Sequence, residues 1–209
     1  MLKTSILSTL FIFTLLMQGC SKDSKTETTQ TQTTKTETTK QVESSAPVVV
    51  EKAKRKISAN EYILSDLNST QHIVTKTSDG FTLKGAEGKV IIFDIYATWC
   101  PPCKAAASHL SSIQENYKDS VVVIGITIED DVSNEKLQEF REAYTANYML
   151  VNSKENRRLV DAIATHLKVG DRFPIPLMAL YKDGVLINHY VGAIQEEFIE
   201  SDIKRALGK

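Results

Sequence analysis

The sequence predicts an α/β domain in which helices flank a central mixed sheet. Two runs, 89–97 and 120–128, are rich in β-branched and aromatic residues, which is typical of strands buried on both faces of a sheet. A segment with helical features follows each run, and the alternating segment 177–192 turns at 182–184 as a hairpin does. Strands that alternate with helices indicate a largely parallel centre, which the hairpin would close with antiparallel strands.

Two further elements are expected in the first half of the domain. The β-like runs 72–77 and 80–84 predict an N-terminal hairpin, because Ser, Asp and Gly lie between them. The segment 101–117 is expected to be a helix, since two prolines open it and the alanines at 105–107 favour helical backbone.

The second half is expected to begin with a strand–helix insertion at about 129–152. Its helix follows a predicted N-cap at Ser133, and its short strand covers 148–151. Two more helices are expected, one ending near Gly170 and one following the hairpin through 198–207.

The chain ahead of this domain resembles an export signal followed by a linker. An apolar run at 6–17 is too short to cross a bilayer, which takes about 20 helical residues. The sequence LMQGC then resembles a lipoprotein cleavage site, so we expect a signal peptide at 1–19 and lipidation of Cys20. Ordinary cleavage nearby is the alternative, and it would leave Cys20 removed or free.

Residues 20–56 are expected to form a lipid-anchored, disordered linker to a domain at 57–209. The linker is rich in Thr, Gln, Ser, Lys and Glu and has too few apolar residues to offset the loss of chain entropy on folding.

Composition and spacing limit the classes of partner. The chain has 25 basic and 26 acidic residues, a balance that gives no indication of nucleic-acid binding. A structural zinc site takes four ligands, usually two cysteine pairs, and the sequence has one pair. We therefore expect no metal, no cofactor and no nucleic acid. The histidines are in no paired metal-ligand spacing: His72, His109, His166 and His189.

The candidate reactive group is WCPPC at 99–103. Cys100 lies just past a predicted buried strand and Cys103 lies in the first turn of a predicted helix. A helix N-terminus stabilises a thiolate through its free N–H groups and partial positive charge. We therefore expect a redox pair, in which Cys100 attacks and Cys103 resolves the mixed disulfide. A static disulfide would close a tiny loop and add little stability, and a Cys–His hydrolase would leave Cys103 without a role.

Two segments resemble thioredoxins, in particular the membrane-tethered TlpA/ResA-like thiol–disulfide oxidoreductases. They are IIFDIYATWCPPCK at 91–104 and IPLMALYKDG at 175–184, and the similarity covers roughly residues 72–208. The resemblance implies a thioredoxin-like fold.

The resemblance also implies a substrate site beside the cysteine pair. The Ile175–Pro176 peptide bond should be cis and should face the CxxC motif. Trp99, Ile175 and Pro176 would then contact an extended substrate segment, with the backbone of Ile175 pairing as in strand addition.

By the same resemblance, the protein would be an extracytoplasmic, membrane-anchored enzyme facing the periplasm or the cell exterior. It would reduce disulfides of exported proteins, for example apocytochromes c in cytochrome c biogenesis. Its partners would be these proteins, a membrane electron donor and, through its lipid anchor, the membrane. The alternatives are a disulfide oxidase or isomerase, a thiol peroxidase, and a non-enzymatic peptide-binding lipoprotein.

The two prolines between the cysteines favour the reductase among these alternatives. A strongly oxidising pair over-stabilises its thiolate, which takes additional hydrogen-bond donors or positive charge. Pro101 and Pro102 have no N–H to donate.

Asp94 is a candidate proton-transfer residue because it lies in an otherwise apolar predicted strand. Burial should raise its pKa and allow it to exchange protons with Cys103. The alternative is an aspartate that is bonded to a hydroxyl or a water in the core.

Overall fold

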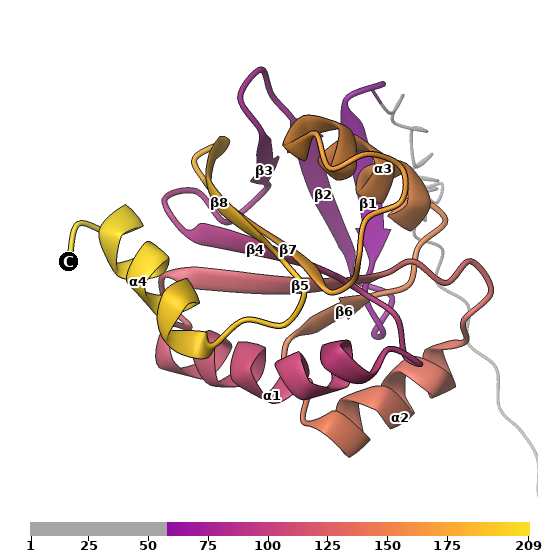
Figure 1. The fold of residues 1–209 in the computed structure, drawn as a ribbon. Coiled ribbons are helices and arrows are strands. Elements are labelled where there is room, and N and C mark those ends of the chain that lie inside the picture. Colours follow the sequence, from indigo (N-terminus) through magenta and orange to yellow (C-terminus); the bar gives the residue numbers. More distant parts are fainter. Residues whose placement is uncertain (1–57) are drawn as a thin grey trace, which may run out of the picture. The chain divides into compact units, whose positions relative to one another are not determined.

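The computed structural model describes residues 58–209 (Figure 1). The expected signal peptide at 1–19 and linker at 20–56, including Cys20, lie outside the described residues. In chain order, the elements of the described part are β1 (Glu61–Ser65), β2 (Gln71–Lys76), β3 (Phe81–Leu83), β4 (Val90–Tyr96), α1 (Pro101–Asn116), β5 (Val121–Thr127), α2 (Asn134–Tyr144), β6 (Met149–Val151), α3 (Asn156–Leu167), β7 (Leu177–Lys182), β8 (Val185–Val191) and α4 (Glu196–Ala206).

The main sheet has five strands in the order β6-β5-β4-β7-β8. Strands β4, β5 and β6 are parallel, whereas β7 and β8 form the antiparallel hairpin that closes the sheet. The predicted mixed sheet is therefore confirmed. In the centre of the sheet, Asp94 of β4 lies opposite Gly125 of β5 and Met178 of β7.

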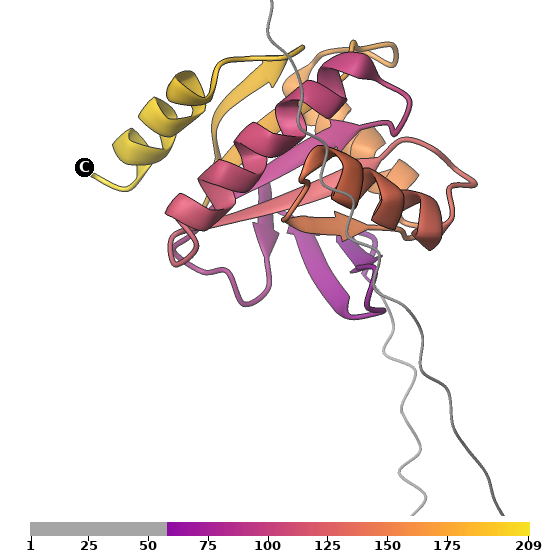
Figure 2. The same ribbon diagram turned by 90° about the horizontal axis from the view of Figure 1, so that it is seen from below.

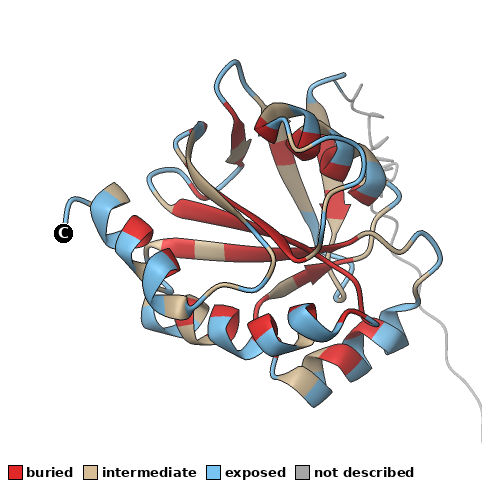
Figure 3. Ribbon diagram, in the orientation of Figure 1, coloured by how far each residue is buried: buried red, intermediate tan, exposed pale blue. Residues whose placement is uncertain are grey.

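Two layers cover the two faces of this sheet (Figures 1 and 2). Helices α1, α2 and α4 pack on one face, and α3 packs on the other together with the strands β1–β3. Every residue of β4 is buried, because the strand is covered on both sides (Figure 3). Its side chains alternate, so Ile92 and Tyr96 point toward α1 while Phe93 and Ile95 point toward α3.

The N-terminal hairpin is present as β2 and β3, and a third strand, β1, extends it to an antiparallel sheet. The strand β1 was not predicted from the sequence. Its residues Tyr62 and Leu64 are buried in the core under α3, and Arg158 of α3 lies 4.1 Å above the Tyr62 ring.

The insertion between β5 and α3 consists of α2 followed by the edge strand β6. Ser133 caps α2 as predicted, because its side chain accepts a hydrogen bond from the Lys136 amide. Leu137 and Phe140 turn toward the core beneath α1. None of the helices within residues 58–209 is long and apolar enough to cross a membrane.

Candidate active site

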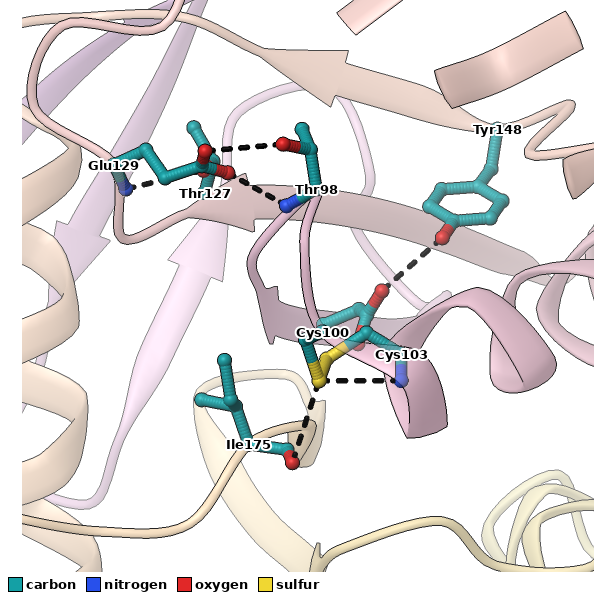
Figure 4. The surroundings of a disulfide bond; sticks show 8 residues. Thr98, Cys100, Cys103, Thr127, Glu129, Tyr148 and Ile175 are labelled. Carbon is teal, nitrogen blue, oxygen red and sulfur yellow. Dashed lines mark hydrogen bonds between the residues drawn. A yellow bond between two sulfur atoms is a disulfide. The ribbon is translucent and has the colours of Figure 1, made fainter. Parts of the chain in front are cut away.

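The cysteine pair lies where the central strand β4 passes into α1. Cys100 is the N-cap residue of α1, and Cys103 is in its first turn. The two cysteines form a disulfide, with their Cα atoms 5.3 Å apart (Figure 4). Both side chains are only 3% exposed. The rigid strand thus holds the pair at the end of the sheet.

The amide of Cys103 is directed at the sulfur of Cys100. Its N–H donates a hydrogen bond to Cys100 Sγ over 3.3 Å. Pro101 and Pro102 occupy the first two helical positions and have no N–H. A capping side chain normally accepts from the second or third helical amide. The third amide, that of Cys103, therefore serves Cys100 here.

A loop from the other side of the sheet faces the pair. The Ile175–Pro176 bond is cis, as predicted. The carbonyl oxygen of Ile175 lies 3.7 Å from Cys100 Sγ, as Figure 4 shows. Pro176 is buried, and its carbonyl accepts a hydrogen bond from the Gly192 amide, which fixes the loop against the end of β8.

Trp99 lies at the surface, immediately before the first cysteine of the pair. Its side chain is 63% exposed although its chain neighbour Cys100 is buried. An aromatic side chain that is exposed next to a reactive sulfur is available for contact with a bound chain. Trp99 is thus exposed immediately before Cys100 in the chain, and the Ile175 carbonyl lies against the Cys100 sulfur.

Asp94 is buried on the face of β4 that packs against α1. The core layer on this face contains Cys100 and Cys103 and is called the cysteine layer. It shares this face with Ile92 and Tyr96, and it is 3% exposed. Tyr148 donates a hydrogen bond to Asp94 Oδ2 over 3.1 Å. Burial raises the pKa of Asp94 to about 7, although the bond from Tyr148 acts in the opposite direction. Asp94 thus has the raised pKa expected of a buried proton-transfer residue, and it is also bonded to a hydroxyl in the core, which was the alternative.

A carboxylate that the sequence analysis missed holds the loop before the cysteines. Glu129, just after β5, accepts from the amide of Thr98 at 2.6 Å and from its hydroxyl at 3.0 Å. Thr127 adds a third donor at 3.2 Å (Figure 4). Thr98 and Glu129 follow the adjacent parallel strands β4 and β5, whose carboxyl ends lie at the same edge of the sheet. Their positions just after two predicted strands were the sequence signal that could have indicated this contact.

Opening and closing the Cys100–Cys103 bond is the chemistry that this arrangement supports. Trp99 is exposed next to the pair, the Ile175 carbonyl lies 3.7 Å from Cys100 Sγ, and Asp94 can exist in either protonation state near neutral pH. The fold and the pair together define a thioredoxin-like dithiol–disulfide protein.

Comparisons with known proteins agree with this class. The model of the AhpC/TSA family matches residues 64–166. Thioredoxin-1 of Drosophila melanogaster is 35% identical over 79 residues, which cover 37% of this chain and 68% of that protein. Thiol-disulfide oxidoreductase ResA of Halalkalibacterium halodurans is 23% identical over 143 residues, which cover 68% of this chain and 71% of ResA.

A solved structure shares the fold at low identity. It is a thiol:disulfide interchange protein of the thioredoxin family from Chlorobium tepidum, with a TM-score of 0.57 and 18% identity. The match covers 74% of this chain and 98% of that chain. The chain belongs to the thioredoxin family, and it is a thiol-disulfide oxidoreductase.

Proposed function

We propose that the protein reduces disulfides of exported proteins outside the cytoplasm. The observation that carries the direction of electron flow is the presence of prolines at the first two positions of α1. A strong oxidant favours its reduced form through extra stabilisation of the attacking thiolate. Neither proline has an N–H, and Pro102 occupies the second helical position, whose amide could otherwise reach Cys100. The thiolate is therefore stabilised less, and the pair gives up its electrons more readily.

The reaction proceeds in two exchanges. The Cys100 thiolate attacks one sulfur of the substrate disulfide, and the other substrate sulfur leaves as a thiolate that takes a proton from water. Cys103 then gives its proton to the Asp94 carboxylate and attacks Cys100 Sγ, which releases the second substrate sulfur. The substrate gains two electrons, and the Cys100–Cys103 disulfide holds the oxidised state.

The substrate segment binds in an extended form between Trp99 and the Ile175–Pro176 loop. Ile175 presents a carbonyl 3.7 Å from Cys100 Sγ, so a chain that pairs with this backbone would be held close to the attacking sulfur. The exposed indole of Trp99 offers apolar contact that does not depend on substrate sequence.

The location and the source of electrons belong to the same proposal. Lipidation of Cys20 would anchor the enzyme to a membrane, with apocytochromes c among its substrates and a membrane protein as electron donor. The resemblance to ResA supports this assignment. Cys20→Ala should release the protein from the membrane fraction or stall its processing. A mature N-terminus other than Cys20, read by mass spectrometry, would contradict the anchor.

Turnover of insulin disulfides tests the catalytic claim. With dithiothreitol as electron source, the enzyme should accelerate reduction, and Cys100→Ser should return the rate to background. Cys103→Ser should also lose turnover while it still reacts once. Equal acceleration by the Cys100→Ser variant would overturn the proposed role of the pair. Consumption of hydrogen peroxide in place of insulin reduction would indicate the peroxidase alternative.

A further inference from the structure

Three side chains pack closely over Gly125, beside the buried acid. Gly125 of β5 lies directly opposite Asp94 of β4 in the sheet register. A Cβ atom on Gly125 would come within 2.7 Å of Leu150 Cδ2, 3.0 Å of Tyr148 Cε2 and 3.2 Å of Tyr96 Cε1. A side chain at this position would therefore force Leu150 to move and would press on the Tyr148 ring, whose hydroxyl is bonded to Asp94.

The segment that carries Tyr148 is fastened to the helix that carries the cysteines. Ser111 of α1 donates its hydroxyl to the carbonyl of Thr145 and accepts from the amide of Asn147 at 2.7 Å. Arg141 of α2 donates to the carbonyl of Tyr148 itself at 3.3 Å. These bonds hold the backbone on both sides of the Tyr148 ring, so its hydroxyl reaches Asp94 from a fixed position.

We propose that Tyr148 is a positioning residue for the redox reaction: its hydroxyl orients the Asp94 carboxyl toward the cysteine layer, and Gly125 provides the space for its ring. The inference rests on the proton-transfer role of Asp94 in the proposed function. It assigns a task to the insertion between β5 and α3, which delivers a side chain across β5 to the central strand.

The hydrogen bond from Tyr148 lowers the pKa of Asp94. A hydroxyl that donates to a carboxylate favours the ionised form, so Tyr148 opposes the effect of burial on Asp94. Among the described residues, no donor reaches the second oxygen, Oδ1. The bond from Tyr148 is thus the contact that keeps the ionised state accessible. The ionisable groups that act electrostatically on Tyr148 or on its neighbour Tyr96 include Arg141 of α2 and Glu129 after β5. The same core layer holds Cys100 and Cys103 of α1, and it is flanked by three partly buried tyrosines, Tyr117, Tyr144 and Tyr190.

Tyr148→Phe is the direct test, because it keeps the ring and removes the hydroxyl. The titration of the Asp94 carboxyl should be followed by carbon-13 NMR in the oxidised protein, where neither cysteine titrates, with Asp94→Asn identifying the signal. Loss of a hydrogen bond to a charged group should raise the pKa of Asp94 by about one unit.

Tyr181→Phe is the matched control. Tyr181 is also a buried tyrosine, but it lies on the opposite face of the sheet, and among the described residues its hydroxyl has no hydrogen-bond partner. Its loss should leave the Asp94 titration unchanged. Gly125→Ala, whose added methyl group presses on the Tyr148 ring as well as on Leu150, should shift the titration in the same direction as Tyr148→Phe.

Kinetics then connect the titration to the reaction. The resolution of a preformed mixed disulfide on Cys100 should be measured in single turnover from pH 5 to pH 9. At pH 6 the Tyr148→Phe variant should be about tenfold slower, since each unit of pKa changes the ionised fraction tenfold below both values. At pH 9 the two rates should converge, which a merely structural defect would not produce.

The outcomes separate the two claims. An Asp94 titration that is unchanged in Tyr148→Phe would overturn the positioning role of Tyr148. A shifted titration with a shifted rate profile would support both the positioning role and the proton transfer. A shifted titration with an unchanged rate profile would support control of Asp94 by Tyr148 but overturn its part in the reaction, together with the proton-transfer role of Asp94. Should Gly125→Ala fail to fold, the Tyr148→Phe titration decides alone.

Discussion

The amide of Cys103 donates to Cys100 Sγ over 3.3 Å, and it is the first amide that α1 offers to this sulfur. The two positions before it are prolines, which have no N–H. The redox behaviour of the pair should therefore respond to the amide at the second helical position, because this amide and the third are those that reach an N-cap side chain.

Pro102→Ala adds this missing amide, so it should make the pair more oxidising. A further hydrogen bond to the thiolate favours the reduced form, and the reduction potential should rise by about 30 mV. Equilibration with glutathione buffers measures the change. Pro101→Ala is the matched control, because the first helical amide does not reach the N-cap side chain. An equal shift in both variants would contradict the account.

The roles of the two cysteines should differ in trapping experiments. Cys103→Ser should accumulate mixed disulfides through Cys100, because the attacking sulfur remains and the resolving thiol is gone. Cys100→Ser should trap nothing above background. Non-reducing gels and mass spectrometry of the captured adducts provide the measurement. Adducts formed through Cys103 in the Cys100→Ser variant would reverse the assigned roles.

Asp94 should lower the stability of the folded protein at neutral and alkaline pH. Its pKa is about 7 in the folded state against an ordinary 3.8, so the folded state binds the proton more tightly than the unfolded state. The contribution of Asp94 to stability is then greatest below pH 4, falls as the pH rises from about 4 to about 7, and levels off above that range. Asp94→Asn should be more stable than the wild type by up to about 4 kcal/mol at pH 8.

Urea denaturation of the oxidised protein at pH 4 and pH 8 provides the comparison. The stability difference between Asp94→Asn and the wild type should nearly vanish at pH 4, where the wild-type carboxyl is already protonated in the folded state. A difference that is the same at both pH values would show that Asp94 is not a titrating buried acid.

Glu129 should stabilise the loop before the cysteines. Glu129→Gln replaces one of two accepting oxygens by an NH₂ group, which cannot accept from Thr98 or Thr127. Loss of a hydrogen bond to a charged group should lower the free energy of unfolding by about 1–3 kcal/mol. Glu115→Gln, whose ion pair with Lys118 is exposed, is the control and should cost little. Equal effects of both changes would remove the special role of Glu129.

Those features that depend on local sequence could be predicted. The apolar run of β4, the prolines that begin α1 and the Ser133 cap of α2 each have a physical signal within a few residues. The strand β1 was missed because it is only five residues long and begins with a charged residue, so its alternation of Tyr62 and Leu64 is a weak pattern.

Contacts between distant residues could not be predicted from the sequence. Asp94 and Tyr148 are 54 residues apart, and they meet because β6 pairs with β5 in one particular register. No local pattern indicates that register, nor that the ring of Tyr148, just before β6, packs against Gly125. The reactive cysteines were thus visible in the sequence, whereas the residues arranged around them needed the fold.

The reduction potential of the wild-type Cys100–Cys103 pair tests the central claim most directly. It can be read from the fraction of disulfide at equilibrium with defined glutathione or dithiothreitol buffers. A protein-disulfide reductase built on Pro101 and Pro102 should have a potential close to that of thioredoxin, about −270 mV. A potential close to about −120 mV, typical of a strong oxidant, would contradict the account and indicate an oxidase.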